Sequence, residues 1–370
     1  MQEKRQSHSI ASPMSGRLPL LIAAVLALVG GPAASLQVPY SLAESSDASL
    51  AQASPIGTLA YTPGRGLHVG DTGFTLGGYS NVNLLRDEGH RAALKLDDLS
   101  FFVIWDLTPR FHLFSELEFE DLVAVDDHGQ GGTNNHVFIV ERLHGDVNLS
   151  DQINIRLGKF LTPVGRWNVI HAQPLVWTTS RPLATLLPFD PHITGAMLFG
   201  SLFADANSVT YSLFGQFVNQ LDSHPEPQQA DRSGGARLEY AGSRAWSIGS
   251  SYLSFSSNGH WQHLGGLDAL AQRGPVQLMG EAVVEAAPAG LGTQWGFYLQ
   301  GVAEVLSNFY LVGRFEHFAQ RQPRQAANLV IPGFAYRPAP YLLLKAEYLI
   351  ADHPVEESPP GFKFSFAFLF

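Results

Sequence analysis

Three glutamates occupy every second position in the stretch "FSELEFEDL", residues 114–122. Successive side chains of a β-strand point to opposite faces, so Glu116, Glu118 and Glu120 would project from one face of a strand. Carboxylates gathered on one protein surface attract cations and repel anions. The apolar residues between them would occupy the other face. The stretch therefore predicts a strand with one strongly negative face and one apolar face.

A second set of titratable side chains lies in the long connection 162–194, "TPVGRWNVIHAQPLVWTTSRPLATLLPFDPHIT". An arginine guanidinium is a rigid fork of donors that binds carboxylates and phosphates. Arginines at a narrow point would favour anions; alternatively, each arginine pairs with a carboxylate of the surrounding protein and holds the connection in place. The titratable residues are Arg166, His171, Arg181, Asp190 and His192.

Motifs of catalysis and cofactor binding are absent from the sequence. It contains no cysteine, which excludes disulfides, thiolate metal sites and cysteine nucleophiles. It also contains no G-x-S-x-G, phosphate-binding loop or dinucleotide fingerprint. We therefore expect no enzymatic activity, no catalytic residue, no cofactor and no metal site.

The elements that carry these residues are short segments in which apolar and polar residues alternate. Long segments of helical period are hard to find, so the pattern indicates an all-β protein of about sixteen strands. The expected strands are 74–85, 92–106, 111–125, 136–148, 152–161, 194–204, 207–218, 234–241, 245–256, 262–271, 275–287, 293–304, 308–318, 327–337, 340–351 and 361–370.

The connections between these strands alternate between tight turns and longer polar loops. Turns such as "SDQ" (150–152) and "DAN" (205–207) alternate with loops such as 126–135 and 352–361. This alternation is typical of a transmembrane antiparallel β-barrel, which we place at residues 57–370. A soluble β-sandwich is the competing structure, but its apolar faces would have to meet in a core. Barrel closure satisfies every backbone group and removes the sheet edges.

The amino-terminal residues have the features of an export signal. Basic residues precede the apolar stretch 18–30, which is too short to span a bilayer, and small residues follow it. We therefore expect a signal peptide at 1–35, followed by an Ala/Ser-rich linker at 36–56.

In such a barrel the polar strand faces line the lumen. Acidic residues outnumber basic ones there, which favours cations. Glu141 would fall on the lipid-facing side of its strand, so we expect a bulge, a strand end or an error of register at that position. The candidate wall residues are Glu116, Glu118, Glu120, Arg142, Arg156, Arg314, Glu316, Lys345 and Glu347.

The long connection 162–194 is too apolar for a disordered loop and too long for a simple one. We expect it to be the third extracellular loop, folded into the lumen as a constriction. The alternatives are that it caps the mouth of the barrel or contains one more hairpin.

The chain ends on alternating phenylalanines, "GFKFSFAFLF", whose last members are Phe366, Phe368 and Phe370. This ending resembles the assembly signal of Gram-negative outer-membrane porins. The stretch "IRLGKFLTPVGRWN" (155–168) resembles porins of the phosphate-selective O/P type. The resemblance implies a trimer of sixteen-stranded barrels with a pore-constricting loop. The acidic wall departs from the arginine and lysine ladder that the resemblance also implies.

The expected function is that of a porin in the cell outer membrane, for passive diffusion of small hydrophilic solutes or ions. Its expected partners are membrane lipid, the solutes, the barrel-assembly machinery and further copies in a homotrimer. The net charge of −10 argues against nucleic acid. The alternatives are a closed structural or adhesion barrel plugged by its long loop and an outer-membrane hydrolase with a Ser–His pair on its lipid-facing wall.

Overall fold

The computed structural model describes most of the chain from residue 58 onward. The predicted signal peptide and linker lie outside the described residues. Within those residues, no helix is both long enough and apolar enough to cross a bilayer. The described ranges are 58–132, 137–219, 229–242, 245–257, 259–288, 292–321, 325–353 and 355–370.

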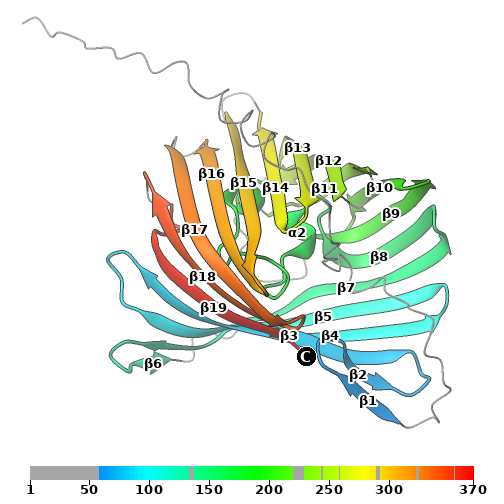
Figure 1. Ribbon diagram of the computed structural model, residues 1–370. Coiled ribbons are helices and arrows are strands. Elements are labelled where there is room, and N and C mark those ends of the chain that lie inside the picture. Colours follow the sequence, from blue (N-terminus) through cyan, green and yellow to red (C-terminus); the bar gives the residue numbers. More distant parts are fainter. Residues whose placement is uncertain are drawn as a thin grey trace, which may run out of the picture.

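Over the described residues, sixteen antiparallel strands form one closed barrel (Figure 1). Each strand pairs with the next one in sequence, and the last pairs with the first, so the barrel has no open edge. This confirms the predicted fold class and strand number. The strands are β3 (Phe74–Asp87), β4 (Ala93–Thr108), β5 (Phe111–Asp126), β7 (Val137–Ser150), β8 (Ile153–Leu161), β9 (His192–Ala204), β10 (Asn207–Gln216), β11 (Arg232–Gly242), β12 (Trp246–Ser257), β13 (His260–Arg273), β14 (Val276–Ala286), β15 (Thr293–Leu306), β16 (Phe309–Gln320), β17 (Gln325–Ala339), β18 (Leu342–Ala351) and β19 (Gly361–Leu369).

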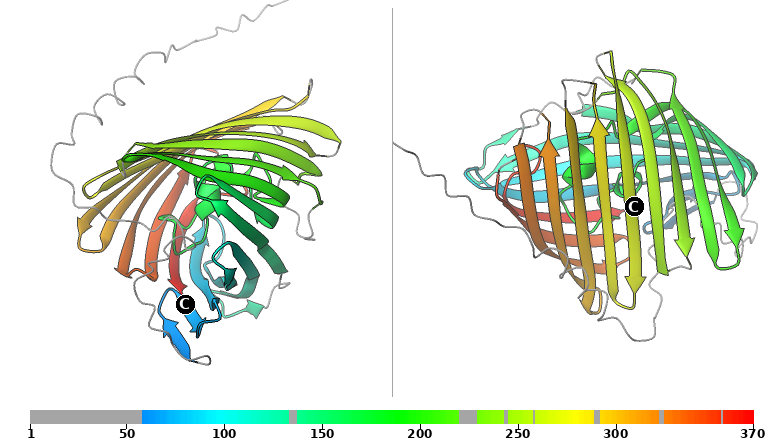
Figure 2. Two further views of the ribbon diagram at one scale, coloured as in Figure 1. Left: turned by 90° about the vertical axis from the view of Figure 1, so that its right-hand side faces the viewer. Right: turned by 90° about the horizontal axis from the view of Figure 1, so that it is seen from above.

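The remaining elements are small. A hairpin of β1 (Leu59–Thr62) and β2 (Gly66–Val69) extends the sheet along β3, and the two-residue strand β6 (Gly131–Gly132) pairs with β5. Two single-turn helices, α2 (Trp167–Ile170) and α3 (Leu183–Leu186), lie between β8 and β9 in sequence. Figure 2 shows these green helical turns surrounded by the strands.

Several of the tight turns predicted from the sequence use left-handed backbone conformations. Asp205 has a φ of 54°, Gly274 of 56° and Asn308 of 65°, each in a two-residue connection between paired strands. Asparagine, aspartate and glycine tolerate this region best, which suits them to such turns.

Alternate side chains of each strand face the outside or the inside of the barrel. On β12, Ile248 and Tyr252 point outward with exposed fractions of 54% and 50%, whereas Ser247 and Ser251 are buried on the inside. The other strands repeat this pattern, so the outer face is mainly apolar and the inner face carries most of the charges. An apolar outer face is what a bilayer requires of a barrel.

Glu141 is the extra residue of a bulge in β7. On β5, Glu116 pairs with Arg142. The next residue, Leu117, pairs with Val140, so the ladder skips Glu141. A bulge interrupts the alternation locally, and the side chain of Glu141 is buried. This confirms the irregularity that the sequence pattern indicates at Glu141.

The barrel closes where β19 meets β3. Phe366 pairs with Val82 and Phe368 with Ser80. The phenylalanine side chains of β19 are half-buried on the outer face, whereas the alternate residues Ser365 and Ala367 are fully buried. The terminal strand therefore has the two-faced character that its sequence predicts.

Candidate functional site

The connection between β8 and β9, residues 162–191, contacts the inner faces of many strands; we call it the inner segment. Its two ends meet where the backbone N–H of Thr162 donates to the carbonyl of Pro191 at 2.8 Å. The sequence pattern predicts that this connection ends at residue 194, but β9 already begins at His192, which pairs with the end of β8. His192 is therefore a wall residue, because strand pairing resumes directly after Pro191.

Apolar side chains of the inner segment pack against apolar patches of the wall. The indole ring of Trp177 lies 4.7 Å from the ring of Tyr310, and its N–H donates to Gln277 at 2.9 Å. These contacts remove a highly apolar connection from water. Other segment residues buried in such clusters are Val164, Trp167, Ala172, Val176, Leu183, Ala184, Leu187 and Phe189.

Two buried wall carboxylates accept hydrogen bonds from the backbone of the inner segment. Glu347 accepts the N–H of Ser180 at 2.7 Å and that of Thr179 at 3.1 Å. Glu316 accepts the N–H of Leu183 at 2.8 Å. The segment has only single-turn helices, so these buried donors need partners from outside it.

Two buried wall cations complete this attachment. Arg314 donates to the carbonyl oxygen of Ser180 at 2.9 Å, to its hydroxyl at 2.6 Å and to Glu316 at 2.7 Å. Lys345 donates to the carbonyl oxygen of Gln173 at 2.9 Å. The exposed fractions of Arg314 and Lys345 are 2% and 1%. These predicted wall residues therefore contact the inner segment and have little access to water.

Arg166 joins the inner segment to three neighbouring strands. Its guanidinium lies 2.9 Å from Glu239 on β11, 2.6 Å from Ser247 on β12 and 3.4 Å from Asp268 on β13. Arg237 also pairs with both carboxylates, so two cations face two anions. This arrangement favours the interpretation of Arg166 as a residue that holds the connection in place.

Arg181 makes its contacts within the inner segment. It donates to the side-chain oxygen of Asn168 and to the carbonyl oxygen of Thr185, both at 2.7 Å, and lies over the ring of Trp167. Asn168 in turn donates to the carbonyl of Thr162 at 2.8 Å. Arg181 and Asn168 thus link the two helical turns to the start of the segment.

The bulge residue Glu141 brings two histidines together. Its carboxylate lies 2.7 Å from Nε2 of His192 and 3.3 Å from Nε2 of His171. Asp190 accepts the backbone N–H of His192 at 3.0 Å and that of Ala230 at 3.3 Å. The structure therefore places these predicted residues in one cluster at the junction of the inner segment with β7 and β9.

On β5, β7 and β8 two pairs of oppositely charged inner residues lie in contact. Arg142 lies 2.5 Å from Glu116, and Arg156 lies 2.7 Å from Asp146. The side chains of Arg142 and Arg156 are 21% and 25% exposed, whereas that of Arg314 is 0% exposed. Water therefore reaches the side chains of Arg142 and Arg156, whereas that of Glu116 is buried.

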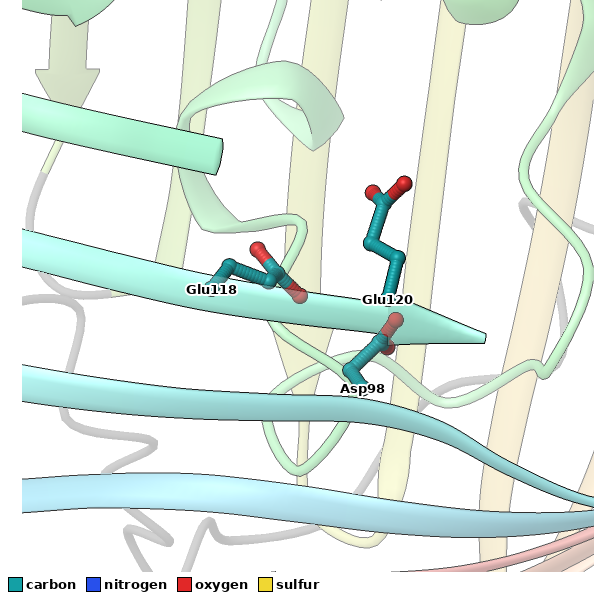
Figure 3. Close-up of side chains that lie close together, drawn as sticks. All are labelled: Asp98, Glu118 and Glu120. Carbon is teal, nitrogen blue, oxygen red and sulfur yellow. The ribbon is translucent and has the colours of Figure 1, made fainter. Parts of the chain in front are cut away.

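Glu118 and Glu120 lie beside Asp98 of the neighbouring strand β4 (Figure 3). Glu118 is buried and accepts a long hydrogen bond, 3.4 Å, from the hydroxyl of Tyr79. The negative strand face predicted from the spacing of the glutamates is therefore extended by a carboxylate from β4.

Asn168 and Asp268 also hold the inner segment but are not evident from the sequence pattern. Asn168 links both ends of the inner segment, but nothing in its local sequence distinguishes it from an ordinary loop residue. Asp268 shares the inner face of β13 with Leu264, yet the glycines between them obscure the alternation. The signal that could have found Asp268 is its two-residue spacing from buried positions.

Gly165 provides a test of how closely the inner segment is attached. Its φ is +66°, and an added Cβ would clash with a carboxylate oxygen of Glu281. That carboxylate accepts the N–H of Trp167 at 2.6 Å and the hydroxyl of Tyr298 at 2.7 Å. We expect Gly165→Ala to lower the unfolding free energy by about 1–3 kcal/mol, measured by denaturant unfolding in detergent.

The matched control is Gly313→Ala on β16, where an added Cβ meets nothing within 4 Å. Its unfolding midpoint should stay close to that of the wild type. Equal stability of the two variants would show that the inner segment has room to move at Gly165.

Comparisons with known proteins show which solved structures share this fold. No family model matches the chain. An uncharacterized protein of Aquifex aeolicus is 21% identical in an alignment of 344 residues, and the match covers 76% of each chain. An anion-selective porin from Comamonas acidovorans matches 80% of this chain and 99% of its own, with a TM-score of 0.58 and 14% identity.

Two further solved structures agree with this match. OmpF of Salmonella typhi, solved with daunomycin, matches 82% of this chain and 99% of its own, with a TM-score of 0.56 and 9% identity. The outer-membrane channel DcaP of Acinetobacter baumannii matches 80% of this chain and 97% of its own, with a TM-score of 0.52 and 10% identity. The chain therefore has the sixteen-stranded barrel fold of the porins.

Proposed function

We propose that the protein is a porin of a Gram-negative outer membrane, through which small hydrophilic solutes or ions diffuse passively. The closed barrel satisfies its backbone groups internally, and its apolar outer face suits a bilayer. In this proposal the inner segment is the constriction, which its hydrogen bonds to the buried wall residues Glu316 and Glu347 support. Several structural neighbours are described as porins or channels, which supports this proposal.

The observation that carries the proposal is the unequal exposure of the inner charges. Two wall residues that hold the inner segment, Arg314 and Glu316, have side chains that are 0% and 1% exposed. Arg142 and Arg156, on the other side, are 21% and 25% exposed. A water-filled path beside the guanidinium groups of Arg142 and Arg156 would account for their exposure.

The test is reconstitution of the purified, folded protein in a planar bilayer. Discrete conductance steps are expected, and a folded protein that gives no channel would exclude the proposal.

Packing of bulky residues such as Trp177 favours the closed, plugged barrel as the second candidate. Swelling of liposomes in small sugars separates the two, because only an open barrel admits the sugar.

The acidic inner face favours cations over anions. Glu118 and Glu120 of β5 lie beside Asp98 of β4, whereas Glu116 is buried and paired with Arg142; focused negative charge raises the local cation concentration. We therefore propose a cation-preferring pore, although the porin from Comamonas acidovorans is described as anion-selective. The phosphate-selective resemblance has no support from this wall.

Arg156→Gln is expected to shift the reversal potential further toward cations. Arg156 forms a two-pronged pair with Asp146, and its loss leaves that carboxylate without the guanidinium in the water-accessible part of the wall. The measurement is the reversal potential in a salt gradient. Arg110→Gln, in the exposed turn before β5, is the control for a charge change away from the constriction.

The enzymatic alternative gains no support from the outer-wall histidines. His263 contacts the hydroxyl of Tyr252, and His317 contacts the side chain of Asn328, so neither is paired with a serine.

We infer further that the protein forms a homotrimer, since a structural neighbour of the same fold, OmpT of Vibrio cholerae, is described in a trimer form. Light scattering of the detergent-solubilised protein tests this.

A further inference from the structure

The imidazole of His171 connects the inner segment to the wall. Its Nε2 lies 3.3 Å from the carboxylate of Glu141, the bulge residue of β7, and the two side chains are 16% and 9% exposed. His192 on β9 approaches the same carboxylate oxygen, Oε1, at 2.7 Å. One buried carboxylate of the wall is therefore within reach of one imidazole from the wall and one from the inner segment.

The contact at the other ring nitrogen fixes which atom of a neutral His171 carries the hydrogen. Nδ1 lies 3.3 Å from the carbonyl oxygen of Asn168, three residues earlier in α2. A carbonyl oxygen only accepts, so Nδ1 must carry the hydrogen and donate it. A neutral imidazole has one N–H, so Nε2 of a neutral His171 is a bare lone pair. This Nε2 is buried and forms no hydrogen bond with the described residues.

Protonation of His171 changes this contact from repulsive to attractive. In the neutral state the Nε2 lone pair faces a carboxylate oxygen of Glu141, and two acceptors repel each other. A protonated imidazole carries a hydrogen on both nitrogens, so Nε2 can then donate a charge-assisted hydrogen bond to Glu141 while Nδ1 still donates to Asn168. His192 differs, because a neutral ring with its hydrogen on Nε2 can donate to Glu141 without an added proton. His171 is therefore the residue whose bond to the wall requires a proton.

The carboxylates around this site favour a positive charge on His171. On the wall, Asp98 of β4 and Glu118 of β5 lie close enough to Glu141 for their charges to act on one another. At the end of the inner segment, the carboxylate of Asp190 accepts the backbone N–H of His192. An imidazolium at this junction is attracted by each of these negative groups.

The positive groups on the neighbouring strands have partners of their own. Lys345 on β18 donates to the carbonyl oxygen of Gln173, two residues beyond the imidazole, and its charge also acts on Asp98. Arg142, next to the bulge on β7, is paired with Glu116 of β5. These cations hold other parts of the wall and of the inner segment, and the bond to the bulge carboxylate is left to the two histidines.

We propose that His171 is a proton-dependent clamp that fixes the inner segment to β7 through Glu141. In mildly acidic medium the imidazolium donates to the carboxylate and holds the segment against the wall. Above the range in which imidazoles ordinarily titrate, about pH 6–7, the ring has no hydrogen on Nε2 and the segment detaches more often. The effect of the clamp on ion flow rests on the proposed porin function, whereas the clamp itself does not.

Nitrogen NMR of the folded, detergent-solubilised protein labelled with ¹⁵N-histidine tests the protonation directly. The His171 signals are identified by their absence from His171→Gln, and a chelator in all buffers keeps metal ions off the imidazoles. The neutral form with its hydrogen on Nδ1 is expected at about pH 8 and the imidazolium at about pH 5.5. A ring that stays neutral in acid would overturn the proposal. So would a neutral ring with its hydrogen on Nε2, because that ring donates to Glu141 without an added proton.

Single-channel recording tests the effect of the clamp on the pore. In the wild type, conductance fluctuations should become at least about tenfold rarer between about pH 8 and about pH 5.5, the factor that one charge-assisted hydrogen bond supplies. His171→Gln keeps an amide donor at every pH, so its fluctuations should be rare throughout, and those of His171→Phe, which has no donor, should be frequent throughout. The control is His317→Phe, whose imidazole contacts Asn328 on the outer wall; it should behave as the wild type does. The same pH dependence in the wild type and both His171 variants would contradict the clamp.

Thermal unfolding supplies a readout that needs no conduction. Acidification from about pH 8 to about pH 5.5 should raise the unfolding midpoint of the wild type relative to that of His171→Phe, because only the wild type gains the bond to Glu141. A midpoint difference that does not change with pH would count against the clamp. The expected NMR and unfolding results without conductance would keep the clamp and reject the porin function. Conductance with a His171 that stays neutral would do the reverse.

Discussion

Replacing Phe370 by serine is expected to reduce the amount of folded barrel in the outer membrane by at least about tenfold. The Phe370 ring lies 5.9 Å from the rings of Phe101 and Phe368, so it joins β4 to β19 across the closing strands. Aromatic pairs contribute about 0.5–1.5 kcal/mol each. The residue also exchanges two backbone hydrogen bonds of 2.9 Å with Gly78. Loss of the ring therefore weakens the step that closes the barrel.

The measurement is the surface level of the variant together with its heat-modifiable mobility in gels, which reports barrel folding. Phe362→Ser is the matched control, because Phe362 lies on the same face of β19 at its other end. That variant should assemble nearly normally. Normal surface levels of Phe370→Ser would show that the terminal ring is dispensable for assembly and that the resemblance to the porin signal is incidental.

The barrel could be predicted from the sequence because its two environments impose a simple period. In β19, each phenylalanine faces outward and each intervening residue faces inward. In β5, the glutamates face inward and the apolar residues between them face outward. Strand number follows from counting such segments. The pairing of β19 with β3 follows because an open apolar edge would be unsatisfied in a membrane.

The partners of the inner segment could not be predicted, because they depend on contacts between distant parts of the chain. The sequence left two interpretations of Arg166 open, since its partner Glu239 lies seventy-three residues away. Local sequence also cannot show whether an irregularity such as Glu141 is a bulge or an error. The contact of Glu141 with His192 could be found only from the strand pairing of β7 and β9 in the folded barrel.

The double variant Glu316→Gln/Glu347→Gln is expected to raise the single-channel conductance. Together the two carboxylates accept three backbone hydrogen bonds from the inner segment. Hydrogen bonds to charged groups contribute about 1.5–3 kcal/mol each. Loss of only 1.4 kcal/mol increases the population of detached segments about tenfold. Glutamine keeps the size of the side chain, so the barrel wall itself should stay folded.

Single-channel recording in planar bilayers is the measurement, with heat-modifiable mobility as the check on folding. Glu304→Gln is the control, because that carboxylate accepts a hydrogen bond from Asn308 in the β15–β16 turn. A segment that constricts an open pore predicts larger steps and more current noise in the double variant alone. A segment that plugs the barrel predicts steps where the wild type has none. Unchanged conductance in a folded double variant would mean that ions follow a path that the segment does not control, and the constriction would have to be sought among the wall charges of β4 and β5.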